Sequence, residues 1–264
     1  MSVSSRTNIH PTAVIDASAI VPASCQIGPY CVIGPEVELG EECTLHSHVV
    51  IGGPTRLGRG NRIFPFTSIG LEPQDLKFRG EKTRLEIGDH NTIRECVTIH
   101  RGTPGGGGLT TVASNCLLMA YVHVAHDCHV GDRVIMANNA TLAGHVTVEH
   151  DSTVGAFCPV HQFVRVGAYA FIGGGTIVTQ DVLPFSKTSA RRENRAYGVN
   201  AIGLERKGFS QERIQKLQRA YRTLLVSKLN TSQAVEKLKS EADSSEDVLA
   251  LIRFIETSER GIIK

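Results

Sequence analysis

The stretch VHVAHDCHVGDRVIMANNATLAGHVTVEHDSTVGAFCPVHQFVRVGAYAFI, residues 122–172, carries an apolar side chain at every sixth position. The series consists of Val124, Val130, Met136, Leu142, Val148, Val154, Val160, Val166 and Ile172. A period of six fits neither a helix nor an ordinary run of strands, so it indicates one small unit stacked on itself. The same period runs from Ile9 to Ile69, from Ile87 to Ile99 and from Val112 to Val178.

A second inward position accompanies each aliphatic residue. Small or β-branched residues such as Cys128, Val134 and Ala140 stand two positions before the next aliphatic residue, so both side chains of a short strand point the same way. Glycine, asparagine and aspartate between them tolerate a turn. Three such strands close a triangular coil of about eighteen residues, and successive coils pair as parallel strands. The aromatic content of 5% and the lack of tryptophan suit a narrow interior.

Two segments interrupt the repeats. The segments near 71–86 and 101–110 lack the inward aliphatic residues, and the second holds four consecutive glycines, so we expect both to form loops. No Lys-Ser/Thr pair and no helix follow the glycines, which excludes a P-loop. The repeats stop after Pro184, and helical spacing begins after Ser210. We therefore predict a mostly β protein, with a parallel β-helix over 1–186 and a C-terminal α-helical cap of three helices within 187–264.

Cysteine usage and hydropathy point to a reduced compartment. Six of the seven cysteines occupy the small inward position, no CxxC motif occurs, and the total is odd, so we expect free thiols. The N-terminus lacks the apolar core of a signal peptide, and no run approaches the ~18 apolar residues of a membrane span. We expect a cytoplasmic protein with no membrane span and no nucleic-acid partner. The locally basic section from Lys187 to Arg222 could meet an acidic protein, a pyrophosphate or only solvent.

Six of the eleven histidines fall between residues 123 and 161, and none takes an inward position. Residues about eighteen apart stack on neighbouring coils, so we expect Asp127 beside His145 and His126 beside the bare backbone of Gly144. Gln162 lies one coil further along. A carboxylate, two imidazoles and an amide on one outer strip can perform general-base chemistry near neutral pH.

A metal site is the alternative use of these histidines. His123, His126 and His129, with His145 one coil away, could bind zinc, as three histidines do in the γ-class carbonic anhydrases on this kind of fold. Residues three apart in a strand and turn do not obviously converge on one ion. We therefore favour a site without metal or cofactor.

Several motifs resemble one enzyme family across the whole chain. They are QDLKFRGEKTRLEIGDHNTIRECVTIHRGT (74–103), VHVAHDCHVGDR (122–133), ANNATLAGHVTV (137–148), VHQF (160–163), GVN (198–200) and RKGFS (206–210). They are similar to the acyl-carrier-protein:UDP-N-acetylglucosamine O-acyltransferases, hexapeptide-repeat enzymes with a left-handed parallel β-helix. The resemblance implies transfer of a 3-hydroxyacyl chain from acyl carrier protein to the glucosamine 3-position of UDP-N-acetylglucosamine, the first step of lipid A synthesis. It also implies a homotrimer with sites between neighbouring prisms.

The resemblance also implies roles for individual residues. His126 would be the general base, Asp127 would orient it, and the Gly144 N–H would hold the oxyanion. The implied sugar and acyl contacts are Asp75, Lys77, His123, His145, His161 and Gln162, and the implied nucleotide and phosphate contacts are Asn200, Arg206 and Lys207. Gly174 would stand at the end of the acyl groove and leave it open. Ile202 departs from the acidic residue that family members commonly carry near the nucleotide.

Two alternative enzymes remain at this point. The related N-acyltransferase of the same pathway usually has an extra N-terminal domain, whereas the repeats here begin at residue 9. A carbonic-anhydrase-like zinc enzyme would need the histidines as ligands. A non-enzymatic β-helix would call for regular outward threonine ladders and would not explain the histidines. The acyl chain length, and whether the acceptor is a 3-hydroxyl or a 3-amino group, stay open.

Overall fold

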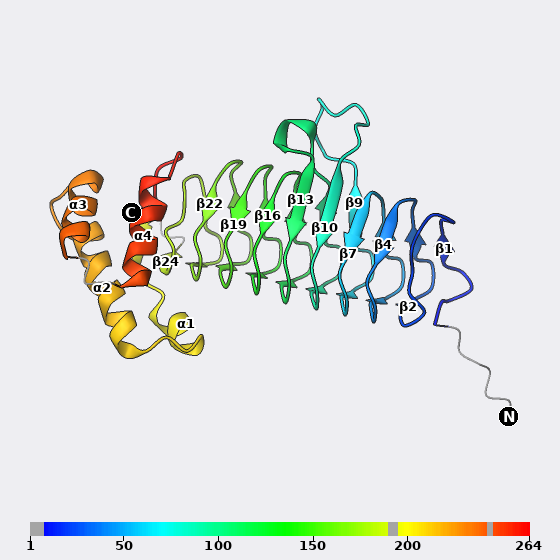
Figure 1. Ribbon diagram of the computed structural model, residues 1–264, viewed down its shortest axis with the longest axis horizontal. Helices are drawn as coiled ribbons and strands as arrows, with labels where there is room; N and C mark the ends of the chain where they lie inside the picture. The colour runs from blue at the N-terminus through cyan, green and yellow to red at the C-terminus, as the bar shows by residue number, and fades with distance from the viewer. Residues whose placement is uncertain (1–7, 190–194, 242–244) are drawn as a thin grey trace.

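The computed structural model describes residues 8–189, 195–241 and 245–264. It is a long prism of short strands with helices packed at one end, and β1 lies at the opposite end (Figure 1). Within these residues, every helix is too short or too polar to cross a membrane.

Successive strands fall on three faces in turn and pair in parallel with the neighbouring coils, apart from one antiparallel pair at the C-terminal end of the third sheet. The first sheet holds β1 (Val14–Ile15), β3 (Val32–Ile33), β6 (Val50–Ile51), β9 (Ser68–Leu71), β12 (Thr98–His100), β15 (His123–Val124), β18 (Thr141–Leu142) and β21 (Pro159–Val160). The second sheet holds β4 (Val37–Leu39), β7 (Thr55–Leu57), β10 (Arg84–Ile87), β13 (Leu109–Val112), β16 (His129–Val130), β19 (Thr147–Val148) and β22 (Arg165–Val166). The third holds β2 (Gln26–Ile27), β5 (Thr44–Leu45), β8 (Arg62–Ile63), β11 (Thr92–Ile93), β14 (Leu117–Leu118), β17 (Ile135–Met136), β20 (Thr153–Val154), β23 (Phe171–Ile172), β24 (Ser186–Ser189) and β25 (Arg195–Val199).

The register stacks like residues on like residues. Val124 pairs with Leu142, and Leu142 pairs with Val160, so the aliphatic residues form a continuous column inside the prism. Each side chain that is fully buried in this way contributes about 1.5–3 kcal/mol. The inward cysteines are buried and free, as predicted. Cys128 donates from Sγ to the Ala143 carbonyl 3.1 Å away, and burial raises the pKa of its thiol to about 12.

The two interruptions project from the same side of the prism (Figure 1). Strand β9 ends at Leu71 and β10 begins at Arg84, and β12 ends at His100 and β13 begins at Leu109. The loops are therefore 72–83 and 101–108, and a short 3₁₀ helix, η1 (Pro104–Gly106), lies in the second. The strands reach further into both segments than the sequence indicated, because Leu85 and Thr110 are fully buried inward residues.

The C-terminal cap differs from the prediction of three helices. It contains α1 (Ala201–Arg206), α2 (Gln211–Leu225), α3 (Thr231–Glu241) and α4 (Glu246–Glu256), so one short helix was missed. The start of this region was also wrong, since β24 and β25 extend the third sheet before any helix begins. The helices bury a core of their own against Leu183 and Phe185. The chain end then returns to the prism, where Ile263 donates from its N–H to the Asp181 carbonyl 2.9 Å away.

Candidate active site

His126 and Asp127 occupy the turn between β15 and β16. Asp127 adopts a positive φ of 59°, a conformation that aspartate tolerates better than most residues, and its side chain points back into the protein. The residue is only 2% exposed. His126 donates from Nδ1 to Oδ2 of Asp127 at 2.7 Å. With Nδ1 carrying the proton, Nε2 of the neutral ring keeps a free lone pair.

The Asp127 carboxylate also accepts hydrogen bonds from the glycine-rich loop. The Thr103 N–H donates to Oδ1 at 2.8 Å, and the Thr103 hydroxyl donates to Oδ2 at 2.6 Å. The Asp127 N–H in turn donates to Oγ1 of Thr110 at 2.8 Å. Burying a carboxylate is costly unless donors surround it, and this network supplies them.

His145 stands one coil above His126. Its Nε2 lies 3.8 Å from Oδ2 of Asp127, and its ring meets the His126 ring edge-on with centroids 5.2 Å apart. Its other face stacks on Phe163 at 4.5 Å. Burial lowers the pKa of His145, while the negative charges of Asp127 and Asp75 act against that change. His145 therefore favours the neutral form beside the His126–Asp127 pair.

Gly144 lies directly against the His126 imidazole. A Cβ on this residue would come 2.6 Å from Cε1 and 2.8 Å from Nε2 of His126, closer than any real contact. Only glycine therefore fits beneath the ring. Among the described residues, none accepts a hydrogen bond from the Gly144 N–H, so this donor is available next to the basic nitrogen.

His123 and His100 form a second, drier pair of imidazoles on the first sheet. Their ring centroids are 5.4 Å apart, and Nδ1 of His123 lies 2.7 Å from Oγ1 of Thr98. Burial, with the nearby positive forms of His100 and His126, lowers the pKa of His123 to about 4. Nδ1 of His100 lies 2.6 Å from the Glu72 carbonyl, which ties the base of loop 72–83 to the prism.

Sequence reasoning missed His100 and Thr103 as site residues. Both stand in the motif HRGT (100–103) at the start of the glycine-rich loop. That position beside a predicted loop was the available signal, because the side chains reach Asp127 and loop 72–83 only through the fold.

The remaining residues predicted to contact the sugar or the acyl chain are more exposed than His126, Asp127 and His145. Asp75 and Lys77 lie in loop 72–83, where the Lys77 N–H donates to Oδ1 of Asp75 at 3.0 Å. His161 and Gln162 are exposed on the next coil, and Nδ1 of His161 lies 3.1 Å from Nη2 of Arg260. Gly174 is exposed in a late turn, where a Cβ would meet only the Ala156 backbone, at 3.3 Å or more.

The nucleotide candidates lie on another edge of the prism. Asn200 caps α1 by accepting from the Gly203 N–H, and its Nδ2 donates to the Tyr169 carbonyl. Lys207 pairs with the buried Asp151, in the turn between β19 and β20. Arg206 is exposed. One chain therefore does not bring these residues to His126.

Asp151 gathers positive charge on that edge. Arg133 donates to both carboxylate oxygens, at 3.0 and 2.7 Å, and Nδ1 of His150 lies 2.9 Å away. Burial would raise the pKa of Asp151, but hydrogen bonds from Arg133, Lys207 and His150 together hold it well below its ordinary value. Asp132 and Glu149 lie in turns of the same edge, so the edge carries both basic and acidic side chains.

The proposed zinc set does not assemble. His129 lies on the second sheet, where its Nδ1 is 2.9 Å from Oγ1 of Thr111, whereas His123 lies on the first sheet. In the described part of the chain, the group that could hold an ion consists of His126, Asp127 and His145, with ligand atoms within 4.8 Å of one another. Because His126 Nδ1 and the Thr103 hydroxyl already bond to Oδ2 of Asp127, hydrogen bonding accounts for this grouping.

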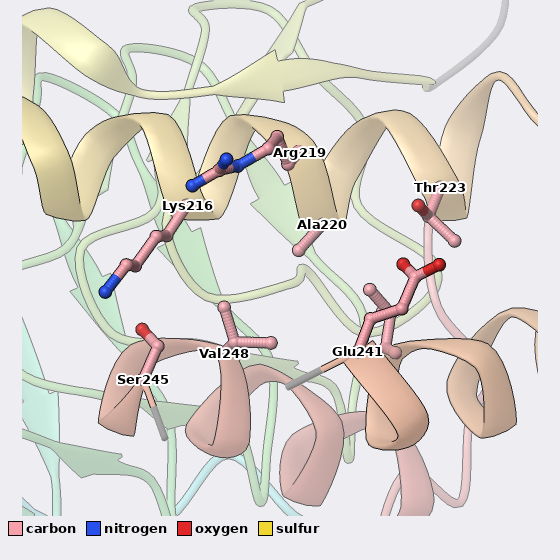
Figure 2. Close-up of a pocket in the computed structure, with 8 residues that line it drawn as sticks. Lys216, Arg219, Ala220, Thr223, Glu241, Ser245 and Val248 are labelled. Carbon is pink, nitrogen blue, oxygen red and sulfur yellow. The ribbon is translucent and has the colours of Figure 1, made fainter. Parts of the chain in front are cut away.

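A cavity in the cap lies between α2, α3 and α4 (Figure 2). Lys216 and Arg219 of α2 border it on one side, and Glu241 and Ser245 border it on the other. Arg219 and Arg222 are exposed on α2. Arg191 and Arg192 of the predicted basic section lie outside the described residues.

Comparisons with known proteins agree with the sequence motifs. The bacterial transferase hexapeptide family matches residues 18–53 and 110–144, and the family described as UDP N-acetylglucosamine O-acyltransferase, domain 2, matches 181–263. An acyl-[acyl-carrier-protein]–UDP-N-acetylglucosamine O-acyltransferase of Xanthomonas euvesicatoria is 49% identical over 256 residues, which cover 97% of each chain. The chain belongs to the UDP-N-acetylglucosamine O-acyltransferase family.

Solved structures of the family share the whole fold. The UDP-N-acetylglucosamine O-acyltransferase of Moraxella catarrhalis superposes with a TM-score of 0.94 at 43% identity, covering 97% of this chain and all of that one. The UDP-N-acetylglucosamine acyltransferase of Francisella novicida gives 0.94 at 39% identity, covering 97% of this chain and 93% of the other. The predicted fold, a left-handed parallel β-helix with a C-terminal α-helical cap, is confirmed.

Proposed function

We propose that the protein transfers a 3-hydroxyacyl chain from acyl carrier protein to the 3-hydroxyl of the glucosamine in UDP-N-acetylglucosamine, the first step of lipid A synthesis. Family membership supports the reaction class. The observation that carries the mechanism is the His126 ring, held at Nδ1 by a buried carboxylate and lying with Nε2 against the backbone of Gly144.

The chemistry follows from that geometry. His126 Nε2 accepts the proton of the sugar 3-hydroxyl while the oxygen of that hydroxyl attacks the thioester carbonyl carbon. The Gly144 N–H donates to the oxyanion that forms, and donors aimed at developing charge are usually the largest catalytic contribution. Collapse of this tetrahedral intermediate breaks the C–S bond, and the His126 imidazolium donates the proton to the departing thiolate. The Asp127 carboxylate holds the ring in one tautomer.

The surrounding residues bind the two substrates. His123, held neutral by burial, contacts the sugar or acyl group together with His145, His161 and Gln162. Asp75 and Lys77 close over the sugar from loop 72–83. Gly174 leaves the far end of the acyl groove open, because no side chain stands there.

A homotrimer completes the site. Asn200, Arg206 and Lys207 contact the nucleotide and its phosphates, yet within one chain they lie on a different edge from His126. Prisms packed side by side place this edge of one copy against the histidine strip of its neighbour. The free thiols support a cytoplasmic location.

Acyl carrier protein docks on the cap. Lys216 and Arg219 of α2 present positive charge beside the cavity in Figure 2, and Arg222 is exposed further along the same helix. An acidic carrier is attracted to such a surface, and the attraction is screened within about 10 Å at 0.1 M salt.

The direct test is product analysis. The purified protein is incubated with UDP-N-acetylglucosamine and 3-hydroxyacyl carrier proteins of several chain lengths, and the sugar nucleotide is analysed by mass spectrometry. We expect one acyl chain attached to the glucosamine O3. Acylation only of a 3-amino analogue would correct the acceptor, acylation of an amine on an already acylated sugar would favour the N-acyltransferase, and zinc-dependent hydration of carbon dioxide would favour the anhydrase.

A further inference from the structure

The glycine-rich loop 101–108 folds onto the buried side of the His126–Asp127 pair rather than merely projecting into solvent. Thr103, 5% exposed, places both its N–H and its hydroxyl on the Asp127 carboxylate. It therefore supplies two of the three hydrogen bonds that the side chain of Asp127 accepts from described residues, and His126 supplies the third.

The glycines of this loop fit the same contact. A Cβ on Gly106 would come 2.0 Å from Cγ of Asp127, and a Cβ on Gly102 would come 2.2 Å from the Leu109 nitrogen. A Cβ on Gly105, by contrast, meets no atom within 4 Å. The loop backbone thus presses on the carboxylate at Gly106, while the adjacent residue faces open space. Flexibility alone would not distinguish the two positions.

We propose that Thr103 is a positioning residue for the acyl transfer, which holds the Asp127 carboxylate aimed at His126, and that the glycines let the loop close on the carboxylate. The inference rests on His126 acting as the general base. Thr103 touches neither substrate and acts through Asp127. The Thr103 hydroxyl and Nδ1–H of His126 share one oxygen, Oδ2, so the hydroxyl fixes the direction from which that oxygen meets the imidazole.

Loss of the Thr103 hydroxyl should shift the acid limb of the rate in a predictable direction. A donor to the carboxylate favours the form of the pair with fewer protons, so its removal makes the pair retain a proton to higher pH. The acid limb of the rate should then move to higher pH, because the base must be neutral to act. Among the described residues, the titratable groups that interact with the pair are His145 above it, His100 and His123 on the first sheet, and the inward thiol of Cys128; Asp75 and His129 act on His145.

The first experiment compares Thr103→Val, which keeps the β-branch and the backbone N–H, with Thr103→Ser, which restores a hydroxyl. For Thr103→Val we expect kcat to fall by about tenfold or more, as for loss of a hydrogen bond to a charged group. The KM for UDP-N-acetylglucosamine should stay within about twofold of the wild-type value. The acid limb should move up by about one pH unit, because the carboxylate loses a single hydrogen-bond donor. Thr103→Ser should restore most of kcat and return the acid limb most of the way to its wild-type pH.

Thr67→Val is the matched control. Thr67 is fully buried, and its hydroxyl donates to the Arg94 carbonyl at 2.8 Å, away from the pair. It should lower thermal stability without moving kcat or the acid limb. If the wild type transfers acyl groups and a folded Thr103→Val keeps its kcat and pH profile, the positioning role is wrong while the proposed function stands. An inactive wild type would instead overturn the proposed function.

A second pair of variants decides the matter if Thr103→Val does not fold. Gly106→Ala forces the loop off Asp127, whereas Gly105→Ala adds the same methyl group to open space. We expect Gly105→Ala to match the wild type in kcat and Gly106→Ala to lose at least about tenfold, with the acid limb moved in the same direction. Equal activity of the two variants would overturn the inference.

Discussion

Gly144→Ala is the substitution for which the structure makes the sharpest prediction. The new methyl carbon would lie 2.6 Å from Cε1 and 2.8 Å from Nε2 of His126. Carbon atoms in contact are normally about 3.5–4.0 Å apart, so the imidazole or the turn must move by about 1 Å. The position of Gly144 in the turn has no positive φ, so alanine causes no backbone strain there.

The expected loss follows from that displacement. A misplacement of about 1 Å at a reacting group costs about 10²-fold in rate. The ring cannot retreat freely, because Nδ1 is held at 2.7 Å by Asp127 and His145 lies edge-on at 5.2 Å. We therefore expect kcat to fall about 10²-fold, with little change in the binding of UDP-N-acetylglucosamine.

The assay measures initial rates of acyl transfer with both substrates saturating, and circular dichroism follows thermal unfolding. Gly174→Ala, in a turn on another edge of the prism where a Cβ would meet only the Ala156 backbone, is the control for folding. Both variants should fold, since neither glycine is part of the aliphatic core. A Gly144→Ala enzyme with near wild-type kcat would refute the placement of His126 against this backbone.

Three further perturbations test other parts of the site. The pKa of His123 is lowered to about 4, so between pH 6.5 and 4 the unfolded chain binds a proton at His123 and the folded protein does not. Stability should therefore fall by up to about 3 kcal/mol as pH drops from 6.5 toward 4, and His123→Gln should reduce this loss in urea unfolding at fixed protein concentration. Arg219→Glu should raise the KM for the acyl carrier protein and leave that for the sugar nucleotide unchanged, and added salt should mimic it; equal weakening of both substrates would assign the charge to the nucleotide or the fold. Gly174→Met should shift the preference to shorter hydroxyacyl donors, since each buried CH₂ is worth about 0.8 kcal/mol, and an unchanged chain-length profile would place the end of the groove elsewhere.

The prism and the histidine strip were accessible from sequence because both depend on local periodicity. Once the repeat is known, coil arithmetic puts Gly144 beside His126 and His145 beside Asp127. In the structure, a methyl group on Gly144 would lie 2.6 Å from Cε1 of His126, and Nε2 of His145 lies 3.8 Å from Oδ2 of Asp127. No tertiary information beyond the coil length is needed. The same arithmetic explains why six cysteines point inward.

The loops and the cap were less accessible. Thr103 reaches Asp127 across 24 residues, through a loop whose path depends on glycines that repeat no pattern. Strands β24 and β25 were assigned to the cap because the hexads had already ended, yet Lys187 pairs with Phe171 and continues the third sheet. Where a sheet ends depends on which backbone groups still need hydrogen-bond partners. That is known only once the end of the prism is assembled.

The most direct test of the central claim is the single-turnover rate of acyl transfer by His126→Ala. His126 lies in a turn and is not part of the aliphatic core cluster, so the variant should still fold. Loss of a general base typically costs about 10²–10⁴-fold, and we expect a loss in that range at every pH, with the acid limb of the wild-type profile abolished. A His126→Ala enzyme that transfers acyl groups at close to the wild-type rate would contradict the account.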